Sequence, residues 1–138
     1  MFDSKIKRDI TSLIRGFFFT QILCSLANLN LVDVFIKKNY FGFNDFKKVK
    51  SKKTLSVIFN YLLNLGFLEK KNNRFCLTLE GKEVFKRHSS FYVPYSYKSY
   101  LDILEQKLTN KKKSLPDINR FLNVLGSGIT HKRYFISA

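Results

Sequence analysis

The feature that most constrains the fold of this chain is the order of helix caps and turn signals between residues 44 and 85. Asn44 and Ser51 belong to the residue types that cap helix N-termini, so they predict a short helix beginning at Asp45 and a second helix after Ser51. Apolar residues then recur three and four positions apart, which predicts that one face of the second helix is buried. These residues are Leu55, Ile58, Phe59, Leu62, Leu63 and Leu65.

A β-hairpin and a further helix are predicted directly after the second helix. Gly66 stands where a left-handed C-cap is wanted. Asn72 and Asn73 form a turn signal between two short runs that predict strands, and Thr78 opens another helix after the second strand. Helix, turn, helix, hairpin and helix in this order predict a mainly α fold: a winged helix-turn-helix with a two-stranded β-hairpin wing and extra N- and C-terminal helices.

The N-terminal segment, residues 5–30, is predicted to be a helix that meets a second copy of the chain. From Phe17 to Ala27 the segment is apolar on nearly all sides, and such a helix is buried on more than one side. In a chain of 138 residues, part of that surface is expected to lie against a partner rather than its own core. We therefore predict a homodimer whose interface contains Phe17, Phe18, Ile22, Leu23 and Leu26.

A secretory signal is the alternative interpretation of the same segment, because a basic start, an apolar run and a small-x-small pattern at residues 25–27 occur in order. However, Asp3 and Asp9 interrupt the basic region, and Thr20 and Gln21 interrupt the apolar one. A membrane span is opposed by these and later polar residues. We predict a cytoplasmic protein without a membrane partner, and we expect the two cysteines, which lie in apolar runs, to be buried free thiols.

The formal net charge of +15 has two interpretations. One is an anionic partner such as nucleic acid. The other is compositional bias, since the abundant lysine, asparagine, phenylalanine, isoleucine and tyrosine share AT-rich codons. In a DNA-binding protein the second helix would enter the major groove, but that helix has no Arg or Gln to read bases. We therefore expect weak and non-specific nucleic-acid binding at most, with candidate phosphate contacts at Lys52, Lys53, Lys70, Lys71 and Arg74.

The segment after residue 90 is predicted to be helical and aromatic. Aromatic residues cluster between Phe91 and Tyr100, and residues 97–108 have the spacing of one amphipathic helix. Asp117 is expected to cap one more short helix. The Gly126-Ser-Gly128 sequence lacks the third glycine and the preceding strand of a nucleotide-binding loop, so we assign it no such role.

Two stretches resemble a known family. The run LLNLGFLEKKNNRFCLTLEGKEVF (residues 62–85) resembles the N-terminal winged-helix dimerisation domain of class I S-adenosylmethionine-dependent O-methyltransferases. The run NVLGSGITHKRYF (residues 123–135) is similar to a signature of one methyltransferase subfamily, on the linker that borders the active-site pocket. The matching residues of that signature are Asn123, Gly126, Gly128, His131, Tyr134 and Phe135, whereas Leu125 replaces an expected aromatic residue.

The resemblance implies a domain organisation and a function. Residues 1–90 would be the winged-helix dimerisation domain, and residues 91–138 a helical linker leading into a methyltransferase domain that these residues do not contain. His131, Tyr134 and Phe135 would border the acceptor pocket of an intact enzyme. We expect no catalytic residue, cofactor site or metal ligand in this chain, because S-adenosylmethionine is bound by the sheet domain in this family.

Three hypotheses follow for the function. The first is a non-catalytic dimerisation and substrate-lid domain of a truncated or split methyltransferase. A related hypothesis is a subunit that acts with a separately encoded catalytic chain. The alternative is a winged-helix DNA-binding transcriptional regulator, which the net charge favours and the second methyltransferase signature opposes.

Overall fold

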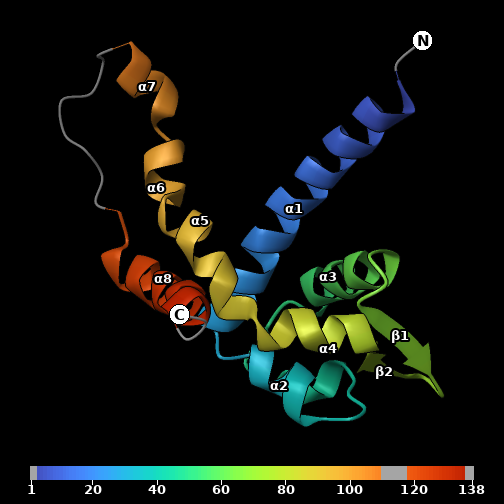
Figure 1. Ribbon diagram of the computed structural model, residues 1–138. Helices are drawn as coiled ribbons and strands as arrows, with labels where there is room; N and C mark the ends of the chain where they lie inside the picture. The colour runs from blue at the N-terminus through green and yellow to red at the C-terminus, as the bar shows by residue number, and fades with distance from the viewer. Residues whose placement is uncertain (1–2, 110–117, 136–138) are drawn as a thin grey trace. The chain divides into compact units, whose positions relative to one another are not determined.

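The computed structural model describes residues 3–109 and 118–135, and it is mainly helical with one two-stranded antiparallel sheet (Figure 1). The chain divides into two compact units. One unit joins residues 1–24 to residues 89–138, and the other is Ser25–His88. The first helix, α1 (Ser4–Asn28), is continuous and contributes residues to both units.

The first unit packs α1 with helices from the C-terminal third of the chain. These are η2 (His88–Phe91), α5 (Tyr92–Ser96), α6 (Lys98–Leu101), α7 (Leu104–Leu108) and α8 (Arg120–Phe135). The ring of Phe19 from α1 lies edge-on against Phe91, with 5.4 Å between the ring centroids. The thiol of Cys24 donates to the Phe91 carbonyl at 3.5 Å. Residues of α1 and of η2 that are about 70 positions apart in sequence are therefore in contact within this unit.

The predicted helix over residues 97–108 is wrong as a single element, because it is divided into α6 and α7. The amide of Ile103 donates to the Tyr100 carbonyl at 3.2 Å, an i to i−3 bond that tightens the chain where α6 ends. The predicted cap at Asp117 lies outside the described residues. Asn119 caps α8, since its Oδ1 accepts from the Leu122 amide at 3.1 Å.

The second unit contains the remaining helices and the sheet. They are α2 (Val32–Lys37), η1 (Phe43–Asp45), α3 (Lys52–Asn64), β1 (Leu68–Lys71), β2 (Arg74–Leu77) and α4 (Leu79–Lys86). The predicted caps of the two longer helices are confirmed. Ser51 Oγ accepts from the Thr54 amide at 3.2 Å, and Thr78 Oγ1 accepts from the Gly81 amide at 3.0 Å.

The predicted turns of the second unit are also confirmed. Gly66 has a φ of 76° after the end of α3, in the left-handed region that favours glycine. Asn72 and Asn73 have φ values of 49° and 61°, which suit the two central residues of a tight hairpin turn. The hairpin pairs Leu68 with Leu77 and Lys71 with Arg74.

The predicted cap at Asn44 is wrong, because Asn44 lies inside the single 3-10 turn of η1. Asp45 takes the acceptor role there, and its Oδ2 accepts from the Gly42 amide at 2.8 Å. A carboxylate is a stronger acceptor than an amide oxygen, and this one also receives cationic side chains described below. Asp45 rather than Asn44 therefore accepts the backbone hydrogen bond at η1, because Asp45 also has tertiary partners.

The core of the second unit is built around phenylalanine rings. Phe35 of α2 lies at the centre, with ring centroids of Phe85, Phe46 and Phe41 at 4.8, 4.9 and 5.0 Å. The ring of Phe59 of α3 lies 5.8 Å from the ring of Phe35, centroid to centroid. These distances are those of edge-to-face and tilted aromatic pairs, so the rings hold α2, α3 and α4 together.

Candidate functional site

Residues 6–18 of α1 leave a broad apolar face exposed to solvent. Six large apolar side chains of this stretch are between 46% and 74% exposed. They are Ile6, Ile10, Leu13, Ile14, Phe17 and Phe18. At 100° per residue they fall on one continuous arc of the helix surface, about 140° wide. We call this surface the α1 apolar arc.

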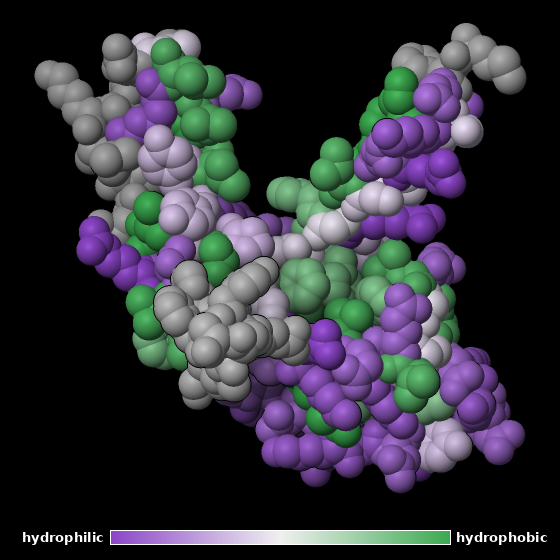
Figure 2. Space-filling model, viewed as in Figure 1, coloured by the Kyte–Doolittle hydropathy of each residue, from purple (hydrophilic) through white to green (hydrophobic). Residues whose placement is uncertain are grey.

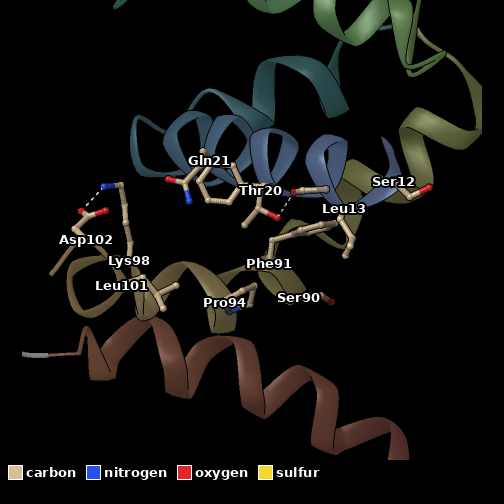
Figure 3. A pocket seen from close by; sticks show the side chains of 12 residues that line it. Ser12, Leu13, Thr20, Gln21, Ser90, Phe91, Pro94, Lys98, Leu101 and Asp102 are labelled. Carbon is tan, nitrogen blue, oxygen red and sulfur yellow. Dashed lines mark hydrogen bonds and ion pairs between the residues drawn. The ribbon is translucent and has the colours of Figure 1, made fainter. Parts of the chain in front are cut away.

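An apolar groove of about 780 Å³ lies within the first unit, between α1 and the segment η2–α6 (Figure 3). Leu13 and Phe17 of the α1 apolar arc line one wall, and Phe91, Pro94 and Leu101 line the other. Figure 2 shows hydrophobic side chains along the facing sides of α1 and of α6–α7, while the outer sides are mainly hydrophilic. Ligand-binding pockets of proteins have a comparable volume and a mainly apolar lining.

Six of the twelve residues that line the groove are polar, namely Ser12, Thr20, Gln21, Ser90, Lys98 and Asp102, although the exposed surface of the groove is mainly apolar. The Thr20 hydroxyl donates to the Gly16 carbonyl at 2.8 Å, so it is satisfied within α1. At the end of the groove Lys98 and Asp102 form an ion pair of 2.7 Å along one helical face. Both pairs are drawn in Figure 3. The surface that the groove exposes is therefore mainly apolar, with an ion pair at one end.

The five residues predicted for a dimer interface separate into two groups. Phe17 and Phe18 are 60% and 52% exposed, and Ile22 is half-buried. Leu23 and Leu26 are only 0% and 3% exposed, so they are already covered within one chain and offer a partner little surface. The sequence pattern did not separate these groups, because all five lie in one apolar run. The exposed apolar residues further upstream, from Ile6 to Ile14, were not among the predicted interface residues.

Three of the five candidate phosphate contacts lie around one pocket. Lys52, Lys70 and Arg74 line a pocket of about 580 Å³ in the second unit, together with Asn44 and Asn73. Lys53 and Lys71 are not among its lining residues. Lys71 pairs instead with Glu69 at 2.7 Å, which raises the pKa of Lys71.

Asp45 is the carboxylate of this pocket. It receives hydrogen bonds from Lys38 and from the Gly42 amide, and Arg74 Nη2 lies 3.6 Å from its Oδ2. The hydrogen bond from Lys38, followed by the Gly42 amide, holds the pKa of Asp45 below its usual range. The sequence pattern gave no sign of this cluster, because its members come from three separated segments.

Two residues of the run 123–135 make close contacts within the first unit. Gly126 lies against α5, where a Cβ atom would be 2.7 Å from Val93 Cγ2 and 2.9 Å from the Val93 nitrogen. Asn123 Nδ2 donates at 3.2 Å to the hydroxyl of Ser96, a buried polar residue of α5. His131, Tyr134 and Phe135 lie within the span of α8, but their side chains are outside the described residues.

The predicted free thiols are confirmed, since Cys24 and Cys76 are both buried and unbridged. Burial raises the pKa of Cys24 to about 12. Among the side chains that the structure describes, in residues 3–109 and 118–127, no three His, Cys, Asp or Glu side chains are grouped so that they could hold a metal ion. By length and composition α1 is apolar enough to cross a membrane, a property that core helices of soluble proteins and N-terminal signal sequences share.

Comparison with protein-family models, with curated proteins and with solved structures finds no match to this chain.

Proposed function

We propose that this chain is a protein–protein interaction module of the winged helix-turn-helix class. The order of α3, the β1–β2 hairpin and α4 in the second unit supports this class. The phenylalanine core around Phe35 supports a rigid scaffold rather than a catalytic cavity. Within this class, we infer the dimerisation and substrate-lid domain of an S-adenosylmethionine-dependent methyltransferase. The two sequence signatures support that choice.

The observation that carries the proposal is the α1 apolar arc. Six half-exposed side chains of this size expose roughly 500 Å² of apolar surface, near the upper end for monomeric proteins. Leu13 and Phe17 line the groove of their own chain, whereas Ile14 and Phe18 lie outside it. Two copies that cover each other's arcs would bury about 1,000 Å² from the arcs alone, which is the lower limit for a specific interface, and the rest of the groove surface would add to this area.

The proposed module has no chemistry of its own. S-adenosylmethionine would be bound by a sheet domain outside these 138 residues, and the module would help to close the acceptor pocket. We place it in the cytoplasm. A separately encoded catalytic chain is a possible partner under the same proposal, and mixing the two chains and assaying methyl transfer would test it.

The test of dimerisation is the molar mass in solution. Size-exclusion chromatography with light scattering at micromolar concentration is expected to give a mass near twice 16.3 kDa. Phe18→Asp is expected to shift the protein toward monomer, because a carboxylate would enter the apolar interface. Leu79→Asp is the matched control, since Leu79 is 83% exposed in the second unit and lies outside the α1 apolar arc. A wild-type protein that stays monomeric would exclude the proposal.

The second candidate function is a winged-helix DNA-binding regulator. The net charge of +15 and the convergence of Lys52, Lys70 and Arg74 favour it. The side chains of α3 do not, because its polar residues lack Arg and Gln for base edges. We therefore rank sequence-specific DNA recognition below dimerisation.

A further inference from the structure

We propose that the pocket between η1, the start of α3 and the β1–β2 hairpin binds a phosphate group. This site is independent of dimerisation, since all of its residues belong to the second unit. The shared chemistry is a doubly or singly charged oxyanion. Its source is either a small phosphorylated compound or the phosphodiester backbone of a nucleic acid.

The charge balance of the pocket favours an anion. Lys52, Lys70 and Arg74 bring three positive charges to the lining, and Asp45 brings one negative charge. That negative charge is already engaged by Arg74 and by Lys38, which lies outside the pocket. The pocket therefore keeps a positive balance, which would repel a cation and attract an oxyanion.

Two of the cations are without a carboxylate partner among the residues that the structure describes. Lys52 Nζ donates at 3.3 Å to Asn44 Oδ1, a neutral acceptor. Lys70 Nζ lies 6.0 Å from the centre of the Phe75 ring. Each ammonium has three N–H donors, so both retain donors for another acceptor. Hydrogen bonds from ammonium to phosphate are charge-assisted and stronger than neutral ones.

The backbone and the neutral side chains also favour an anion in this pocket. Lys52 is the first residue of α3, a helix of 13 residues, so the positive end of its dipole lies at the pocket. Asn44 and Asn73 also line the pocket, and an asparagine side chain carries two N–H donors. Arg74 is held in place by a 2.9 Å hydrogen bond from Nη2 to the Tyr40 carbonyl. Pocket geometry and charge thus converge on one ligand class.

The experiment is a titration of the whole ¹⁵N-labelled chain with inorganic phosphate, at constant ionic strength maintained with chloride. We expect saturable shifts at the amides of Gly42, Asn44 and Asn73. The double variant Lys52→Gln/Lys70→Gln is expected to weaken binding by about tenfold or more. The control Lys47→Gln/Lys48→Gln removes the same charge from exposed lysines that do not line the pocket, and it is expected to change affinity less than about twofold.

A parallel titration with a short DNA duplex identifies the source of the phosphate. Saturable binding of inorganic phosphate with the expected variant pattern supports a site for small phosphorylated compounds. Binding of the duplex alone, with the same variant pattern and the same shifted amides, supports a phosphodiester ligand. The proposal is overturned if neither probe saturates, if the shifts spread over all lysine-rich surfaces, or if the control variant loses as much affinity as the pocket variant.

Discussion

Gly126 shows how a single residue without a side chain joins two helices. Its backbone approaches α5 so closely that a Cβ would lie 3.1 Å from the Ser89 carbonyl oxygen as well as against Val93. Three residues upstream, Asn123 holds the buried Ser96 hydroxyl, and that hydroxyl donates at 2.6 Å to the Val93 carbonyl. The contact of α8 with α5 thus depends on the missing side chain of Gly126 and on the hydrogen bond between Asn123 and Ser96 beside it.

We expect Gly126→Ala to destabilise the first unit by about 1–3 kcal/mol, because the methyl group overpacks a close helix contact. Urea unfolding followed by circular dichroism measures the change. Gly16→Ala is the matched control, since Gly16 lies in α1 with nothing within 4 Å of an added Cβ. There the better helix propensity of alanine is expected to stabilise the protein by up to about 1 kcal/mol. Equal effects at the two glycines would contradict the close-approach account.

The buried thiols lead to a second prediction at the residue scale. Burial raises the pKa of Cys24 to about 12 and also raises the pKa of Cys76. The thiolate is the reactive form, so neither residue should react with iodoacetamide at pH 8 in the native protein, and both should react in guanidinium. Mass spectrometry counts the adducts. Rapid native alkylation at Cys24 would show that its surroundings open easily.

The raised pKa of Cys24 also makes the free energy of unfolding depend on pH. A thiol whose folded pKa exceeds its unfolded value favours the folded state at low pH. This contribution is fully present below the ordinary value of 9.0 and is lost as pH rises toward about 12.

At the scale of elements, Asp45 connects η1 with two other segments of the second unit. Its carboxylate receives Lys38, from the chain after α2, and it lies near Arg74 of β2. The partners are partly exposed, but the Asp45 side chain itself is only 20% exposed. One carboxylate therefore ties a turn, a loop and a strand together.

We expect Asp45→Asn to lower the free energy of unfolding by about 1 kcal/mol at pH 7, because it removes charge-assisted hydrogen bonds. Since the folded pKa lies below 3.8, the contribution of Asp45 is fully present above about pH 4 and is lost as pH falls through the lowered pKa. The difference between wild type and variant should therefore shrink in acid.

Asp33→Asn provides the control for this element. Asp33 forms an exposed i,i+4 pair with Lys37, and such pairs contribute only about 0.3–0.5 kcal/mol. Denaturant titrations of both variants between pH 7 and pH 3 measure how much free energy of unfolding each carboxylate contributes, and how that contribution changes in acid. A difference for Asp45→Asn that stays constant in acid would show that the effect comes from packing rather than from charge.

The elements also show what the sequence could predict. The caps at Ser51 and Thr78 and the turn at Asn72-Asn73 depend on neighbours within four residues, so local pattern was sufficient. The division between α6 and α7 was not predictable, because apolar spacing continues across it. The winged helix-turn-helix assignment and the dimer remain predictions.

The candidate sites could not be predicted either, because their residues are far apart in the sequence. Lys52 and Arg74 were singled out as basic residues, but only the folded chain places them with Lys70 around one pocket. The apolar groove combines α1 with residues that follow it by about 70 positions or more. Local periodicity indicates that one face of a helix is apolar. It does not identify the segment that packs against that face.

At the scale of the whole molecule, the net charge of +15 is expected to produce non-specific attraction to nucleic acid. If the chain neutralises three phosphates of a duplex, affinity should fall by about fortyfold between 50 and 200 mM salt. Two duplexes of unrelated sequence should bind equally within about twofold, because α3 lacks base-reading side chains. Fluorescence anisotropy measures both quantities, and a hundredfold preference for one duplex would restore the regulator hypothesis.

The division into two units also sets an order of events during synthesis. The second unit, Ser25–His88, is continuous, so it can fold as soon as it leaves the ribosome. The N-terminal part of α1 must wait for Phe91 and the helices after it. We expect the apolar face of α1 to be exposed during that interval, as in other incompletely folded chains. In ribosome-arrested chains of increasing length, protease resistance of the middle segment should precede protection of Cys24 from alkylation.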